Sequence, residues 1–245
     1  MTLYLIYSLD FILPLMLVLL VGRRLLRGSW TAVALGFVAF FVAGTLVLVS
    51  QTVAPFFGVA ADSVAMAVLI STGAGVFEEG ARLTAFSALL ALKRPLERAN
   101  GVMYALGHSG MEAMFFGAMT MFVLMLLAWV PEHIPEPRPP ELDAFAAMGA
   151  GSALADVLSR VILGPIIHSV WSLVVLLAVA RRQLRYFFLA VAWHFAHDMM
   201  AIAVIPRLES EIWVNAWLAF VALFYSAALV YLFRVVWAPG VEAKP

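Results

Sequence analysis

The sequence predicts an all-α membrane protein, a polytopic bundle of about seven transmembrane helices with its N-terminus outside and its C-terminus inside the cell. Its 245 residues are 64% hydrophobic and only 12% charged, and the mean hydropathy is +1.01. A soluble domain of this length would carry about twice that charged fraction. Long apolar segments without barrel-like alternation favour helices, because a chain in lipid must satisfy its backbone hydrogen bonds internally. We expect residues 1–245 to form a single integral membrane domain.

Seven apolar segments are long enough to cross a bilayer. The first lacks a basic leading region and a small-residue cleavage site, so we interpret it as a retained span rather than a signal peptide. The third and fourth exceed the roughly 20 residues that a crossing needs, so we expect them to tilt or to extend into water. In chain order the segments cover residues 3–22, 30–50, 62–92, 100–130, 160–180, 186–205 and 212–236.

The basic residues between these segments predict the orientation. With the N-terminus outside, only Arg138 and Arg207 fall on the outer side, and Arg82 and Arg160 lie in or near spans. The bias follows the positive-inside rule and indicates an N-out, C-in topology. The remaining eleven of the 15 basic residues fall on the inner side: Arg23, Arg24, Arg27, Lys93, Arg94, Arg98, Arg181, Arg182, Arg185, Arg234 and Lys244.

The loops and the overall charge exclude several classes of function. The longest loop, PEHIPEPRPPELDAF at residues 131–145, is Pro-rich and acidic, and we expect it outside the membrane and extended. The chain has no cysteine, which excludes disulfides, thiolate metal sites and a cysteine nucleophile. A formal net charge of zero does not indicate a nucleic-acid partner. We expect a multi-pass protein of a bacterial plasma membrane, in contact with lipid.

Ionisable residues occupy the middle of four predicted spans. At 1.5 Å per residue, they lie about 14–22 Å from the basic residues at the inner ends of their helices. Unpaired, each charge near a helix centre would cost about 3 kcal/mol, so the set must be paired, neutralised, hydrated or bound to a metal. The residues are Glu78, Glu79 and Arg82 in the third span, His108 and Glu112 in the fourth, His168 in the fifth, and His194, His197 and Asp198 in the sixth.

Helical spacing places most of these residues on one polar face of each helix. Glu78 with Arg82, His108 with Glu112, and His194 with Asp198 are each four residues apart. In the fifth span, the corresponding stripe is Arg160, Gly164, His168 and Ser172. We therefore expect one water-accessible cavity lined from four helices.

Carboxylates and imidazoles in such a cavity can activate water for hydrolysis. A Glu beside a neutral His is a general-base arrangement, and three or four His and carboxylate ligands would suit zinc. The HExxH signature of soluble metalloproteases is absent, and so are a serine in a Gly-rich motif and the paired aspartates of presenilin-like proteases. The sequence therefore predicts a site based on glutamate and histidine.

The order of the motifs resembles the YhfC family of intramembrane metalloproteases, which is related to the CAAX-protease and PrsW-type membrane proteases. EExxR, HxxxE, an Arg followed eight residues later by His, and HxxxD cover residues 70–200. CAAX-type enzymes have EExxxR and FxxxH, whereas Tyr104 holds the Phe position here, so prenyl-protein cleavage is not inferred. The resemblance implies catalytic roles for Glu78, Glu79, Arg82, His108, His194 and Asp198, with His108, Glu112, His168 and His194 as candidate ligands of Zn²⁺.

The resemblance implies cleavage of a membrane protein or peptide, by a metal-bound or a glutamate-activated water. Two other classes remain open: a proton- or ion-coupled transporter, for which we find no inverted repeats, and a non-catalytic membrane scaffold or immunity-type protein. Outside the cluster, Asp156 and Arg160 are expected to form a local ion pair, Asp10 to be solvated and His197 to pack beside the site. The oligomeric state and the substrate are not predicted.

Overall fold

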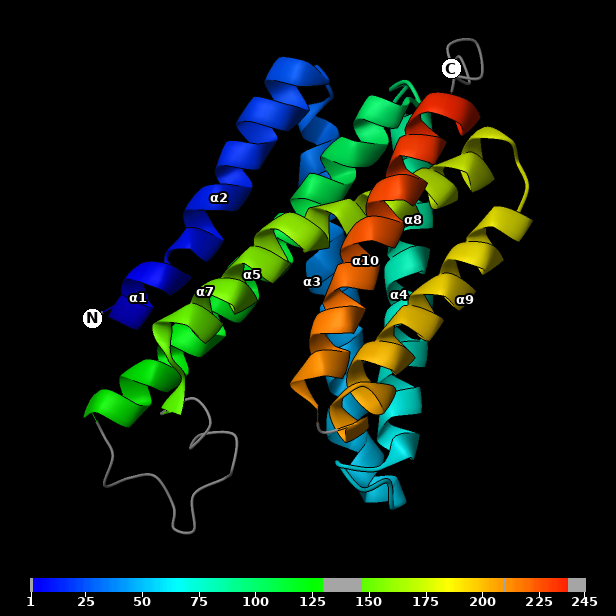
Figure 1. The fold of residues 1–245 in the computed structure, drawn as a ribbon. Helices are drawn as coiled ribbons and strands as arrows, with labels where there is room; N and C mark the ends of the chain where they lie inside the picture. The colour runs from blue at the N-terminus through cyan, green and yellow to red at the C-terminus, as the bar shows by residue number, and fades with distance from the viewer. Residues whose placement is uncertain (1, 130–146, 209, 238–245) are drawn as a thin grey trace.

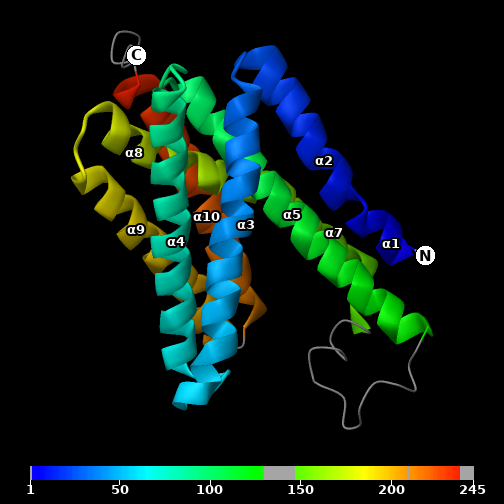
Figure 2. The same cartoon turned by 180° about the vertical axis from the view of Figure 1, so that it is seen from behind.

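The computed structural model describes residues 2–129, 147–208 and 210–237, and Figures 1 and 2 show them as a bundle of helices. Within these residues, seven helical segments are long and apolar enough to cross a membrane, and no strand is found. The predicted all-α class and the number of spans are therefore confirmed. The predicted loop at 131–145 lies outside the described residues, and the N-out, C-in orientation stays a prediction.

The first four spans follow the predicted segments closely. Two of their helices begin at a serine whose hydroxyl accepts a backbone N–H: Ser29 from Thr31 and Ser63 from Met66, both at 3.1 Å. The elements are α1 (Thr2–Tyr7), α2 (Leu9–Leu17) and η1 (Val18–Leu25) in the first span, α3 (Trp30–Val53) and η2 (Ala54–Phe57) in the second, α4 (Val64–Ala91) in the third and α5 (Arg98–Trp129) in the fourth.

The fifth span begins about ten residues earlier than predicted. It runs from Ala150 to Ala180, because a short helix packs under α1 before the predicted start at residue 160. The sixth and seventh spans lie where the sequence placed them. The elements of the fifth span are α7 (Ala150–Leu158), the π-helical η4 (Ser159–Leu163) and α8 (Gly164–Ala180). They are followed by α9 (Arg185–Asp198) with the π-helical η5 (Met199–Val204), the 3₁₀ helix η6 (Pro206–Leu208), α10 (Glu211–Tyr231) and the π-helical η7 (Leu232–Val236).

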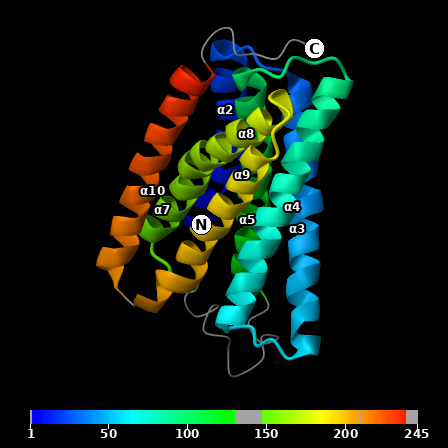
Figure 3. The same cartoon turned by 90° about the vertical axis from the view of Figure 1, so that its right-hand side faces the viewer.

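Helix α8 is the centre of the bundle. Every residue from His168 to Ala178 is buried, and α8 packs against α4, α5, α9 and α10. Figure 3 shows α8 enclosed among these helices. A helix that is apolar on all sides is expected at such a central position.

Two glycines bring α3 and α5 into backbone contact. A Cβ added at Gly36 would overlap the carbonyl oxygen of Tyr104, and one added at Gly107 would overlap the carbonyl oxygen of Val33. Only residues without a side chain permit this approach. The contact fixes α5 beside α3 at the level of His108, the first histidine of the predicted site.

Candidate active site

Arg82 links the two carboxylates of the EExxR motif on α4. The side chains of Glu79 and Arg82 are completely buried, and their ion pair is formed within the helix. The same guanidinium lies 3.4 Å from Glu78 Oε2 and contacts Nδ1 of His168 on α8. A single arginine therefore contacts both glutamates.

The histidine of α5 lies against the first of these glutamates. His108 Nε2 is 3.0 Å from Glu78 Oε2, and the His108 side chain is fully buried. The ring of Phe40 on α3 meets the imidazole edge to face, with centroids 5.6 Å apart. Within the described residues, His108 Nδ1 has no hydrogen-bond partner. These contacts hold the imidazole in place from α3 and direct Nε2 toward Glu78.

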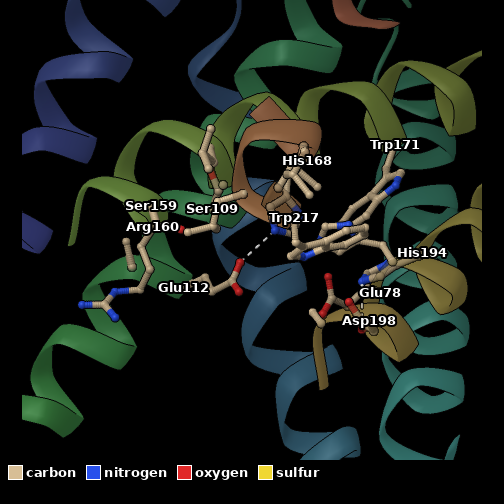
Figure 4. A pocket seen from close by; sticks show the side chains of 18 residues that line it. Glu78, Ser109, Glu112, Ser159, Arg160, His168, Trp171, His194, Asp198 and Trp217 are labelled. Carbon is tan, nitrogen blue, oxygen red and sulfur yellow. Dashed lines mark ion pairs between the residues drawn. The ribbon is translucent and has the colours of Figure 1, made fainter. Parts of the chain in front are cut away.

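His168 on α8 pairs with the second polar residue of α5. Its Nε2 lies 2.8 Å from Glu112 Oε2, a contact that Figure 4 marks between the two side chains. The rings of His108 and His168 are 4.8 Å apart between centroids. His108 and Glu112, four residues apart on one face of α5, thus bind different partners rather than each other.

A second group of polar side chains lies behind the first. His194 Nδ1 on α9 is 2.7 Å from Glu79 Oε1, and its Nε2 is 3.5 Å from Asp198 Oδ2. The ring of Trp171 stacks on His194, with centroids 3.9 Å apart and planes inclined by 15°. Arg82 joins this group to the first through its contacts with Glu79 and Glu78.

A cavity of about 300 Å³ lies among α4, α5, α8, α9 and α10, and Glu79, Arg82 and His108 are not among its lining residues. Those that do line it from this group are Glu78, Glu112, His168, Trp171, His194 and Asp198. Figure 4 shows Glu112 on one side of it and Glu78, His194 and Asp198 on the other, with His168 and Trp171 between them. The exposed side-chain fractions are 34% for Glu112, 17% for Glu78 and 18% for Asp198. Water can therefore reach three carboxylates that lie near the middle of membrane-spanning helices.

Three of the side chains could hold a metal ion together. Glu78, His108 and His168 each present one ligand atom, and these atoms all lie within 4.8 Å of one another. In a tetrahedral zinc site with bonds of about 2.0 Å, ligand atoms are roughly 3.3 Å apart, so small side-chain shifts would close the set. Two imidazoles and a carboxylate also match the donors of catalytic zinc sites. Among the described residues this group fits a divalent metal.

The three-residue group contains two of the four predicted metal ligands. These two are His108 and His168, and the third member is Glu78, which was predicted to be catalytic but not to bind the metal. Glu112 is beside the group, in contact with His168. His194 faces Glu79 and Asp198 instead. Spacing along single helices could place these residues at one depth but could not show which helices face each other.

Two residues near the site differ from what the sequence suggested. Asp10 was expected to be solvated, but it is fully buried and pairs with Arg160 at 2.8 Å, because α2 packs beside η4. The predicted ion pair of Asp156 with Arg160 is confirmed at 2.7 Å.

The sequence analysis did not identify Trp171 as a residue of the site, although its position three residues after His168 places it on the same side of α8.

His197 packs beside the site as expected. Its ring lies among three aromatic rings, those of Trp171, Trp217 and Tyr225, with centroid distances of 5.5, 5.5 and 5.3 Å. It also forms part of the cavity wall. Its contacts are thus aromatic, in contrast to the ionic contacts of His194.

Comparison with known proteins identifies a family. A family model described as YhfC intramembrane metalloprotease matches residues 9–219, which is most of the chain and includes every residue of the cluster. No curated protein and no solved structure matches the chain.

Proposed function

The chain belongs to the YhfC intramembrane metalloprotease family, and we propose that it hydrolyses peptide bonds of membrane-embedded proteins or peptides in the cavity between α4, α5, α8 and α9. One observation carries the proposal. Glu78, His108 and His168 offer ligand atoms within 4.8 Å of one another, and two of them, Glu78 and His168, line a cavity inside a bundle of membrane-spanning helices. Such a site joins a metal-binding group to water within the bilayer, and intramembrane hydrolysis needs both.

We assign the metal ligands to Glu78, His108 and His168, and the proton acceptor to Glu112. A Zn²⁺ ion bound there would activate water and polarise the scissile carbonyl. Glu112 has the most exposed of the three cavity carboxylates, and its contact with His168 holds it beside the ligands. It can therefore take a proton from water in the cavity and deliver it to the leaving amine.

The second group, which contains Glu79, His194 and Asp198, supports the reaction by positioning a hydrogen-bond donor at the cavity. Glu79 fixes the ring of His194 through Nδ1, so that Nε2 is turned toward Asp198 and the cavity. We assign to His194 the stabilisation of the oxyanion that forms when water attacks the carbonyl. Arg82 fixes the positions of the Glu78 and Glu79 carboxylates by contacting both of them.

The experiment compares two glutamine variants of the purified protein in liposomes, with zinc content and peptide cleavage measured on the same samples. Glu78→Gln should lose bound zinc together with activity, because a ligand is removed. Glu112→Gln should keep its zinc and lose about 10²–10⁴-fold in cleavage rate, the usual effect of removing a general base. Treatment with a chelator should abolish wild-type cleavage, and added zinc should restore it.

Asp62→Asn is the matched control, since this carboxylate is exposed and lies outside the cavity. It should keep both zinc and activity. A Glu78→Gln protein that retains zinc but not activity would transfer the role of general base from Glu112 to Glu78, with water activated beside His108. Normal cleavage by both variants would refute the assigned site.

A further inference from the structure

A second cavity lies on the other side of the same carboxylates. It has a volume of about 380 Å³ and is formed between α3, α4 and α5. Its walls carry Phe40 and Phe41 from α3 and Phe115 and Phe116 from α5. We call it the α3–α5 groove. Glu78 and Glu112 are its only ionisable lining residues in the part of the chain that the structure describes.

Glu78 and Glu112 line both the α3–α5 groove and the polar cavity of the candidate active site. The two spaces differ in character, because the polar cavity also contains Arg160, His194 and Asp198. The groove therefore meets the site at its two water-accessible carboxylates and is otherwise lined by aromatic, aliphatic and uncharged polar side chains.

The α3–α5 groove is open toward the surroundings of the helix bundle. Figure 2 shows α3 and α5 crossing and then diverging toward the C-terminal end of α5. Along its edges Phe41 is 44%, Leu48 57% and Phe116 46% exposed. In a membrane-spanning bundle, such side chains at mid-span face the hydrocarbon of the bilayer.

Gly44 keeps part of the groove empty. It lines the groove on α3, and a Cβ added there would meet only the tip of the Phe40 ring, at 3.9 Å. A glycine in a helix interior is less favourable than alanine by roughly 1 kcal/mol. The space beside Gly44 is therefore left open, and it can accept a side chain of a bound molecule.

We propose that the α3–α5 groove binds an apolar segment of a membrane-embedded peptide and receives a large apolar side chain next to the bond to be cleaved. The proposal rests on the proposed function, since it names the route and the sequence preference of that protease. The peptide enters sideways from the bilayer between α3 and α5, and its backbone reaches Glu78 and Glu112 at the inner end of the groove.

A peptide fits this groove better than a lipid chain does. The inner end consists of carboxylates, which can accept hydrogen bonds from peptide N–H groups but gain nothing from contact with a hydrocarbon chain. The amide side chain of Gln51 on α3 offers a further polar contact along the wall. The two carboxylates also disfavour acidic residues in the peptide, because like charges would meet at low dielectric.

The first test reduces the size of the groove and measures sequence preference. Gly44→Leu is compared with Gly80→Leu, a glycine of α4 beside which an added Cβ also meets nothing. Synthetic transmembrane peptides carry either Phe or Ala next to the scissile bond. The Phe-to-Ala ratio of kcat/KM should fall about 10-fold or more in Gly44→Leu, since pocket size discriminates side chains by roughly 10–200-fold. In Gly80→Leu the ratio should equal that of the wild type.

Retained cleavage of the Ala peptide by Gly44→Leu shows that the variant is folded. An unchanged ratio in that variant would overturn the groove assignment while leaving the protease intact. Conversely, a wild-type protein that cleaves none of the peptides would contradict the proposed function, and a binding measurement then tests the groove by itself.

That measurement uses photo-cross-linking in the Glu78→Gln background. A photoreactive benzoylphenylalanine is placed either at Leu48, which lines the groove, or at Leu46, which is 42% exposed on α3 but does not line it. The transmembrane Phe peptide should cross-link at position 48 at least several-fold more than at position 46. Equal yields at both positions, or adducts with phospholipid alone at position 48, would overturn the proposal.

Discussion

At the scale of single residues, Arg82 determines how so much charge can be buried near mid-membrane. It is fully buried, pairs with Glu79, reaches Glu78 and contacts His168. An isolated charge near a helix centre costs about 3 kcal/mol, whereas a paired and hydrogen-bonded charge costs much less. The glutamates are therefore tolerated because one guanidinium is shared between them.

Replacing Arg82 should destabilise the protein strongly. Arg82→Met leaves the buried Glu79 with His194 as its remaining partner, and breaking a buried ion pair typically costs about 3–5 kcal/mol. Thermal or denaturant unfolding in detergent measures the loss. The double variant Arg82→Met with Glu79→Gln should recover part of it, because the uncompensated charge is gone. Independent, additive effects of the two changes would show that the pair does not act as a unit.

The sequence predicted which residues would meet but not how they pair. Depth along each helix and i, i+4 spacing brought Glu78, His108, His168 and His194 to one layer, and the structure places them around Arg82 and Trp171. The pairing of His108 with Glu78 and of His194 with Glu79 depends on how the helices are rotated relative to each other. Side-chain packing between helices sets this rotation, and a hydropathy pattern does not record it.

At the scale of helices, close contacts and breaks in the helices position the site. The α3–α5 contact through Gly36 and Gly107 fixes the height of His108, and Gly75 allows α4 to approach the backbone of α9 at Val191. In the residues that the structure describes, π-helical segments occur in four spans, at η1, η4, η5 and η7, and two of them, η4 and η5, contribute residues to the wall of the polar cavity. Such turns are frequent at functional sites.

Enlarging Gly36 should separate α3 from α5. Gly36→Leu places a side chain where the Tyr104 carbonyl lies, and backbone atoms cannot yield as a flexible side chain can. Overpacking typically costs about 1–3 kcal/mol, and a backbone clash is expected at or above the upper end. Unfolding in detergent provides the measurement, with Gly80→Leu as control because its added side chain meets open space. Equal stability of the two variants would contradict the close contact.

The buried ion pair of Asp10 with Arg160 should attach the first span to the fifth. Asp10 lies against Gly117 of α5 and pairs with Arg160 of η4, which Asp156 also contacts. Asp10→Asn should lower stability by roughly 1–3 kcal/mol, the value of a hydrogen bond to a charged group, because Arg160 keeps its second partner. Asp62→Asn serves as the exposed control. If the free energy of unfolding of Asp10→Asn equals that of the wild type, the ion pair does not stabilise the protein.

The sequence signal for this part of the fold was weak. The residues before position 160 contain Gly149, Gly151, Ser152 and Asp156, a composition that does not suggest a membrane helix. Contacts supplied by the first span stabilise α7, including a hydrogen bond that Tyr7 donates to Asp156 at 3.2 Å. Long apolar spans were thus predictable from composition, whereas a helix held by tertiary contacts was not.

At the scale of the whole molecule, the two cavities give the protein two distinct sides at mid-membrane. One is polar and holds the candidate active site, and the other is the apolar α3–α5 groove. The loops predicted to lie on the inner side also meet at one end of the bundle. Arg98 donates a hydrogen bond to the carbonyl of Phe233 in η7, and Ser29 in the first loop donates one to Asn100 near the start of α5. The predicted inner side is thus one contiguous end of the structure.

The predicted topology has a direct test. A reporter that is active only in the cytoplasm should work when fused after Pro245, and one that is active only outside should work when inserted at Pro139 in the predicted outer loop. Both results follow from the basic residues at the inner helix ends. Activity of the external reporter at Pro245 would reverse the orientation or change the number of spans.

The partners of α4 have a consequence for synthesis of the protein. Among the seven spans, α4 is the least apolar, and it leaves the ribosome long before all of its partners exist. His168 follows Arg82 by 86 residues, roughly 4–17 s of translation at about 5–20 residues per second. During this interval the ion pair of Arg82 with Glu79, three residues away on the same helix, is already available. The EExxR motif therefore brings the counter-ion of Glu79 into the insertion machinery on the same helix, before the other helices of the bundle have been made.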